Sequence, residues 1–270
     1  MGIAIHTVAG TATGTVDNAT HAFAPGAGDS FAVRNFAASA TAALELLVGQ
    51  FPTANDLQVR SPALHDVAKG IHEYVGVMEP VRVLPQSNVQ LLVAQDALIV
   101  ELVQRAVGTA AANCVALGMY YSDLPGASAR LHSQGDISGN IKYITTVRVD
   151  VVKSGVSGQW ASAALNSAED LFHANKDYAI LGYIVEGAAC AVALHGDDTS
   201  NYRVGGPGSA VQSDTRDFFW EESDMRSTPH IPVFNAANKA STYVDVVDNG
   251  VAGTVSVFMQ VAELVANLSA

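Results

Sequence analysis

Two short acidic stretches hold the residues of this sequence that are best suited to binding a cation or to transferring a proton. The first is HGDDTSN, with Asp197, Asp198 and Asn201, and the second is RDFFWEESD, with Asp217, Glu221, Glu222 and Asp224 around Trp220. Oxygen atoms are the ligands that Ca²⁺ takes, and neighbouring carboxylates can act as general acid and base. The first stretch lacks the D-x-[DN]-x-[DN]-G pattern, and the second is typical of a solvated loop beside an aromatic anchor. Asp197, Asp198, Asp217 and Glu221 are therefore candidate metal ligands only, and we expect no catalytic residue and no cofactor.

The remaining chemical motifs are absent from the sequence. The eight histidines, at positions 6, 21, 65, 72, 132, 173, 195 and 230, form no His-x-His pair of the kind that a metal-binding β-barrel enzyme needs. The glycine-rich segments PGAGDS and VGGPGS lack the lysine of a phosphate-binding loop, and SGVSGQ and QGDISG do not have the G-x-S-x-G spacing. Cys114 and Cys190 lie in apolar runs and are expected to be buried free thiols. These observations favour a protein that is not an enzyme.

The elements that carry these residues are predicted to be short β-strands. Runs rich in Val, Leu, Phe and Tyr are bounded by Gly, Pro, Asn or Asp, as expected for a sandwich or jelly roll. In the first half the predicted runs are 29–36, 40–48, 56–60, 66–75, 80–84, 89–93, 97–103 and 109–121; in the second they are 142–153, 178–185, 188–195, 201–204, 217–221, 230–234, 242–247 and 254–262. The run 142–153 alternates most clearly, with Tyr143, Thr145, Val147, Val149 and Val151 on one face.

Two segments depart from this pattern. WASAALNSAEDLFHANK, residues 160–176, is expected to contain a short helix with Leu165, Ala168, Leu171 and Phe172 on one face. The segment 124–140, rich in Pro, Gly and Ser, is expected to connect the two halves of the chain.

The two halves also resemble each other in sequence. DSFAVRNF faces DYAILGY, VRSP (59–62) faces VGGP (204–207), and VLPQSN faces HIPVFN, with Pro85 and Pro232 147 positions apart. Glu101 in IVELV and Asp245 in YVDVV are 144 positions apart. Because these matches keep one order and a nearly constant offset, they predict an internal duplication. The predicted fold is all-β, with two tandem jelly-roll β-sandwiches at 29–130 and 131–270, preceded by an arm or strand at 1–28.

Composition limits the classes of partner. Charged residues make up only 15% of the chain, and the formal net charge is −12. The first 28 residues contain no Lys or Arg, so we expect no direct binding to nucleic acid. No secretory signal and no membrane-spanning run are recognised. Low charge is expected of a protein that buries much of its surface against neighbouring subunits.

Two tandem sandwiches of eight strands each, over residues 29–264, resemble the double jelly-roll major capsid proteins of tailless icosahedral bacterial or archaeal viruses. The resemblance implies a homotrimer with a pseudo-sixfold outline. It also implies assembly with other capsid proteins into a virion shell, often over an internal membrane, after synthesis in the host cytoplasm.

Two alternatives remain open at this stage. A tandem β-sandwich surface protein that binds glycans would use exposed aromatic residues with Asp and Asn, and HGDDTSNY with Tyr202 fits that pattern. A double jelly-roll hydrolase would need converging carboxylates in a cleft, for which the 217–224 segment is the candidate. A fold alone does not separate these functions.

Overall fold

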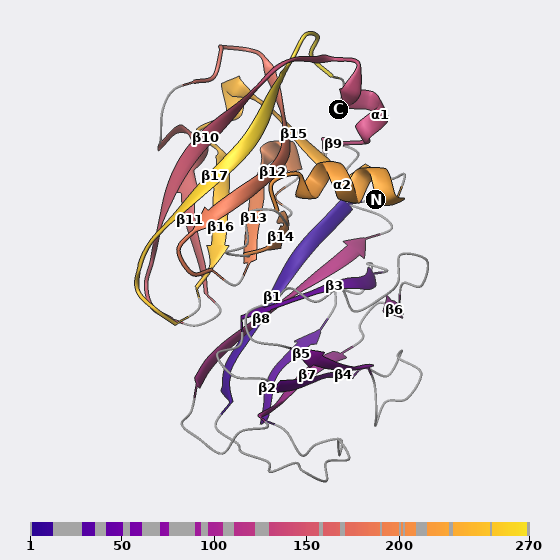
Figure 1. Cartoon of the computed structure of the whole chain (residues 1–270), viewed down its shortest axis with the longest axis vertical. Helices are drawn as coiled ribbons and strands as arrows, with labels where there is room; N and C mark the ends of the chain where they lie inside the picture. The colour runs from indigo at the N-terminus through magenta and orange to yellow at the C-terminus, as the bar shows by residue number, and fades with distance from the viewer. Residues whose placement is uncertain are drawn as a thin grey trace.

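The computed structural model describes eight strand segments between residues 2 and 121. It also describes residues 130–268, apart from 157–158, 168–170, 190, 200, 202, 209–214, 227–228 and 249. Strands dominate both parts, the strand pairs of the described residues are antiparallel, and the helices there are few and short. The described chain is therefore all-β, as predicted. Figure 1 shows the sheets of residues 2–121 at one end of the long axis and those of residues 131–264 at the other.

The first part of the chain forms two four-stranded sheets. Its strands are β1 (Gly2–Ala12), β2 (Asp29–Asn35), β3 (Ala42–Gln50), β4 (Asn55–Arg60), β5 (Ile71–Val75), β6 (Gln90–Leu92), β7 (Ala97–Gln104) and β8 (Ala111–Tyr121). The sheet orders are β1-β8-β3-β6 and β2-β7-β4-β5. Part of the predicted arm at 1–28 is therefore β1, which pairs with β8 along its whole length. The predicted run 80–84 lies outside the described residues.

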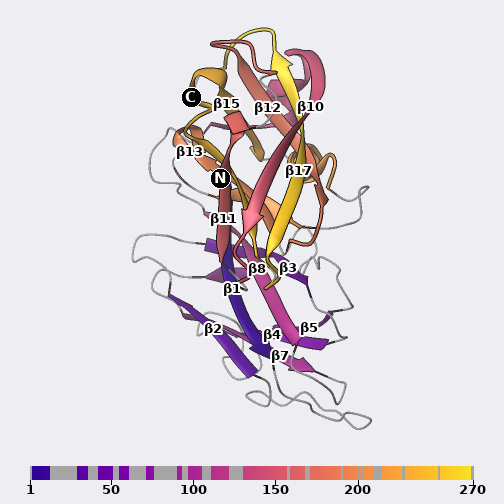
Figure 2. The same ribbon diagram turned by 90° about the vertical axis from the view of Figure 1, so that its left-hand side faces the viewer.

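The second part forms a five-stranded and a four-stranded sheet, drawn from magenta through orange to yellow in Figures 1 and 2. Its strands are β9 (Leu131–His132), β10 (Ile141–Lys153), β11 (Trp160–Ala164), β12 (Asp177–Glu186), β13 (Ala191–Gly196), β14 (Val204–Pro207), β15 (Ile231–Asn235), β16 (Thr242–Val247) and β17 (Gly253–Leu264). The orders are β10-β17-β12-β15-β9 and β11-β16-β13-β14. When each strand from β10 on is numbered by its place after β9, the sheet order β10-β17-β12-β15 becomes first-eighth-third-sixth, as in β1-β8-β3-β6. In the same way, β11-β16-β13-β14 becomes second-seventh-fourth-fifth, as in β2-β7-β4-β5.

The core of the second part lies between the inner faces of its two sheets. Val147, Val149 and Val151 of β10 are fully buried, whereas the residues between them are exposed, so the predicted inner face of this strand is confirmed. Val244 and Val246 of β16 face them from the second sheet and belong to the same buried cluster. Period-two alternation thus places one apolar face of each strand in the core.

The prediction of a strand at 217–221 is wrong, because these residues begin the helix α2 (Phe218–Arg226). Phe218 and Phe219 are both buried, and successive residues of a strand would point to opposite faces of a sheet. The helix packs against β12 and β15, where Tyr183 lies 6.2 Å and 5.9 Å from the ring centres of Phe218 and Phe219. The burial of both adjacent rings is therefore better satisfied by a helix than by a strand.

Two further predictions about local structure need correction. In the segment 160–176, which was expected to contain a short helix, Trp160–Ala164 form β11 and pair with β16. Leu165–Ser167 make a short 3₁₀ turn, and Ala168 lies outside the described residues. The predicted connector 124–140 contains β9 and the helix α1 (Gln134–Ser138). Ser133 and Asp136 form a capping box at the start of α1, so the spacing S-x-x-D predicts this helix.

The VGGP segment is β14, and its second glycine is required by packing. A Cβ atom at Gly206 would lie 2.4 Å from a ring carbon of Phe218 and 2.7 Å from the hydroxyl of Tyr183. The absence of a side chain therefore lets α2 and β12 close the core over β14. Pro207 is the last paired residue of this edge strand, where a missing N–H group costs no hydrogen bond in the sheet.

We predict that Gly206→Ala lowers the free energy of unfolding by about 2 kcal/mol, because the added methyl group overpacks the core. Gly139→Ala is the matched control, since no atom lies within 4 Å of the position that its Cβ would take. Denaturant unfolding followed by circular dichroism measures both variants. Equal stability of the two variants would contradict this account of Gly206.

Candidate functional site

The first acidic candidate, Asp197–Asp198, is divided between solvent and an ion-pair network. Asp197 is exposed, whereas Asp198 is buried and accepts hydrogen bonds from the backbone of Asn235 and the amide of Asn238 at 3.2 and 3.1 Å. Arg130 donates to Asp198 at 3.4 Å and also pairs with the fully buried Asp177. The Asp198 carboxylate therefore fixes the 197–199 turn against β15, which is a structural role.

The second candidate stretch lies on α2 and does not bring its four carboxylates together. Asp217, Glu221 and Asp224 are exposed, whereas Glu222 is buried. With its amide oriented to satisfy both neighbours, Gln134 of α1 donates to Asp224 at 2.7 Å and accepts from the indole N–H of Trp220 at 2.8 Å. Within the described ranges, no group of three or more His, Cys, Asp or Glu residues is placed to hold a metal ion.

A third acidic group, which the sequence analysis did not single out, is centred on Glu263 near the end of β17. Its carboxylate is fully buried and has four partners. Lys142 donates to Oε1 at 2.7 Å, the hydroxyls of Tyr143 and Tyr178 each donate to Oε2 at 2.7 Å, and His173 Nδ1 lies 2.5 Å from Oε2. These contacts join β10, β12, β17 and the segment before β12.

The electrostatics of this group keep Glu263 ionised. Burial by itself would raise the pKa of Glu263, but the hydrogen bonds from His173, Lys142, Tyr143 and Tyr178 outweigh it and hold the pKa well below its usual range. Burial raises the pKa of Tyr178 well above its usual range, so this tyrosine stays protonated and donates. Glu263 therefore links β10, β12 and the segment before β12 to β17 through one ionised carboxylate.

The signal for Glu263 is present in the sequence. Glu263 follows a series of alternate β17 residues that all face the core: Val255, Val257, Met259 and Val261. A carboxylate in such a row must be paired, because an unpaired buried charge is costly. The aromatic partner Tyr143 was predicted on the inner face of β10, whereas His173 comes from a loop whose path the sequence does not specify.

A fourth group lies on the outer face of the smaller sheet. Asp245 of β16 is fully buried, and Arg203 donates to its Oδ2 at 2.7 Å. His195 Nδ1 lies 2.7 Å from the same oxygen, and the Arg203 guanidinium stacks over Trp160 at 4.8 Å. Oδ1 of Asp245 has no hydrogen-bond partner in the part of the chain that the structure describes. The aromatic and basic side chains cover the carboxylate, so it orders this face and is not open to a ligand.

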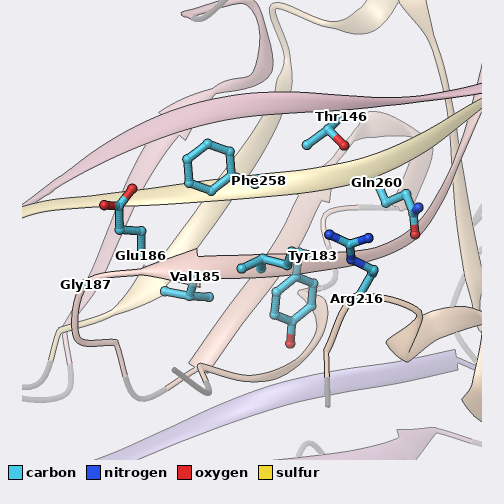
Figure 3. A pocket seen from close by; sticks show the side chains of 9 residues that line it. Thr146, Tyr183, Val185, Glu186, Gly187, Arg216, Phe258 and Gln260 are labelled. Atoms are coloured by element: carbon cyan, nitrogen blue, oxygen red, sulfur yellow. The ribbon is translucent and has the colours of Figure 1, made fainter. Parts of the chain in front are cut away.

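A hollow with a volume of ≈640 Å³ lies on the outer face of β10, β17 and β12. Figure 3 shows Phe258 between Glu186 at one end and Arg216 with Gln260 at the other. A Cβ atom at Gly182 would lie 2.1 Å from the carbonyl oxygen of Arg216, so the segment before α2 crosses β12 at this glycine and forms one wall. The described lining contains no His, Cys, Ser or Lys, and its mixture of apolar and polar groups suits contact with another polypeptide surface.

Comparison with known proteins does not place the chain in a family. No protein-family model matches it, and no curated protein matches its sequence. A structure of the Macrobrachium rosenbergii nodavirus is 10% identical, with a TM-score of 0.28 over 98% of this chain and 98% of that one. The protein YhaK from Escherichia coli is 9% identical, with a TM-score of 0.22 over 94% of this chain and 82% of that one. Scores this low do not establish a common fold, so fold and function are inferred from the chain itself.

The helices that the structure describes are all too short or too polar to cross a membrane.

We predict that Glu263→Gln lowers the free energy of unfolding at pH 7 by about 2 kcal/mol, because charge-assisted hydrogen bonds become neutral ones. The depressed folded-state pKa means that the carboxylate stabilises the fold fully above the unfolded pKa of about 4.3 and progressively less as the pH falls below it. The difference in free energy of unfolding between the wild type and Glu263→Gln is therefore smaller at pH 3.5 than at pH 7, as measured by denaturant unfolding. The exposed Asp197→Asn is the control and should change little at either pH. A wild-type advantage that stays constant with pH would contradict this interpretation.

Proposed function

We propose that the chain is a structural coat protein with two jelly-roll sandwiches related by internal duplication, and that it assembles as pseudo-hexameric homotrimers into an icosahedral virion shell. The observation that carries the proposal is the strand order. In both halves the first, eighth, third and sixth strands form one sheet, and the second, seventh, fourth and fifth form the other, once β9 is counted as an addition at the edge. This order is that of a jelly roll.

Local features support the duplication independently of strand order. β3 has a bulge where it pairs with β8, and β12 has one where it pairs with β17. Glu101 of β7 lies opposite Ser30, and Asp245 of the corresponding β16 lies opposite Ser162. An acidic residue opposite a serine at the same place in both halves is expected if the halves derive from one ancestral sandwich.

Strand order also corrects part of the repeat alignment. The Glu101–Asp245 match joins β7 to β16, which occupy the same place in their halves. VRSP begins with the last two residues of β4, whereas VGGP is β14, and by strand order β4 corresponds to β13. DSFAVRNF likewise contains β2 and faces β12, whose counterpart is β3. The early matches are thus displaced by one strand, because short valine-rich strands resemble each other wherever they lie in the sheet.

Surface composition supports assembly as the function. Among the residues of the second half that the structure describes, six large apolar side chains are exposed: Ile144, Val152, Val156, Leu171, Val251 and Val265. A trimer of a duplicated chain brings six similar sandwiches into one ring, which closes with few kinds of contact. The partners are then other copies of the chain and other capsid proteins, and no direct contact with nucleic acid is expected.

We predict that the purified protein forms trimers and larger shells at micromolar concentration. Mass photometry measures the masses present, and negative-stain microscopy shows the outline of the particles. Only 28.1 kDa monomers would contradict the proposal and would favour the glycan-binding alternative, which a glycan array then tests.

A further inference from the structure

Three of the exposed valines gather at one tip of the second sandwich. Val152 near the end of β10, Val156 in the loop that follows, and Val251 in the loop before β17 are 73%, 49% and 62% exposed. We call Val152, Val156 and Val251 the valine tip. Exposed apolar side chains that gather in this way mark contact surfaces more often than isolated ones do.

The two loops of the valine tip lie side by side. A Cβ atom at Gly155 would lie 3.0 Å from the backbone nitrogen of Ala252, so the loops touch there. Gly155 and Gly250 have φ angles of 85° and 88°, which glycine adopts at low cost. The backbone of both loops is therefore set for this close approach.

A buried ion pair fixes the base of the valine tip. Asp248 is fully buried and accepts from the backbone N–H groups of Gly155 at 2.6 Å and Gly250 at 2.9 Å, one from each loop. Lys153 is also buried, with its Nζ 3.9 Å from Asp248, and it donates to the carbonyl of Ala188 at 2.6 Å. Asp248 thus joins the two loops, so the valines are held in place before any partner binds. This lowers the entropic cost of binding.

Charge limits what can bind at this place. The chain has a net charge of −12, so copies repel each other at low ionic strength, and a contact surface that carries no charge adds no local repulsion to this. Residues 154–160 and 249–254 contain no charged side chain, and the charges of Lys153 and Asp248 are buried beneath them. The valine tip is thus an uncharged surface through which two acidic copies can make contact.

The position of the valine tip also favours a neighbour beside the molecule. In Figure 1 the end of β10 and the start of β17 lie at the left, at one end of the second sandwich and on the flank of the whole molecule. A neighbouring subunit packed alongside would meet this flank.

We propose that the valine tip is a contact surface for a second copy of this chain, in the contacts that join elementary oligomers into larger particles. This inference rests on the proposed function. Three valine side chains cannot bury the roughly 1,000 Å² that a stable pairwise interface needs. The contact is therefore weak singly and becomes effective when a closed assembly repeats it.

The test compares a triple variant, Val152→Thr, Val156→Thr and Val251→Thr, with two controls at other exposed apolar positions. Threonine keeps the branched shape of valine and adds a hydroxyl. Ile144→Thr is on the outer face of the same strand, and Val265→Thr lies after β17. Mass photometry over a concentration series gives the concentration at which large particles form. We expect the triple variant to raise this concentration by about tenfold or more and to retain the smallest oligomer. The two control variants should leave the concentration unchanged.

The outcomes separate this inference from the proposed function. If the wild type forms no particles, both are wrong. If the wild type and the triple variant form particles equally well, the valine tip is not the contact and the proposed function stands. Flotation of the wild type, but not the triple variant, with neutral phosphatidylcholine vesicles would overturn the inference in favour of a lipid surface. Should the triple variant lose its circular dichroism spectrum, the single loop variant Val251→Glu replaces it, with the same expectation.

Discussion

The second half of the chain depends on the burial of one face of β17 against the opposite sheet. β17 pairs with both β10 and β12, so its inward residues Val255, Val257 and Val261 must fit beside two other strands at once. A shift of one residue in either pairing would turn these valines to solvent and expose the opposite face of the strand to the core. This register fixes where each strand ends, and the polar groups of the structure gather at those ends.

Buried ion pairs occupy both ends of this sandwich, beyond the last apolar layer. At one end Asp177 pairs with Arg130 and accepts from the backbone of Leu268, which holds the C-terminal segment, and Glu263 lies close by in the same sheet. At the other end Asp248 holds the two loops of the valine tip. The ion pairs satisfy backbone and side-chain groups that the core cannot satisfy, and they order the ends of the sandwich. Such pairs give specific geometry more than net stability.

Much of the fold could be predicted from the sequence, because alternation and turn residues are local signals. The inner face of β10, the existence of most strands and the all-β class follow from period two. The helix α2 was missed because Phe218 and Phe219 are apolar like a strand, and only the tertiary position of Gly206 shows how they pack. The ion-pair groups could be foreseen only in part. Glu263 and Asp245 are charges inside apolar strands, but their partners His173 and Arg203 come from loops. The candidates Asp217 and Glu221 form no site, because both lie on the exposed face at the start of α2.

The two halves share their strand order, and this arrangement accounts for a chain with little charge, ordered sandwich ends and exposed valines on one flank. In the proposed coat protein, duplication would supply two similar sandwiches, and divergence of their loops would let each meet a different neighbour. A cryo-electron microscopy reconstruction of the purified protein tests this account most directly. We expect six jelly-roll sandwiches around a threefold axis, alternating between residues 1–130 and 131–270, with neighbouring particles in contact along the flanks. A map in which the first half has a different strand order, or in which the chains stay separate, would contradict it.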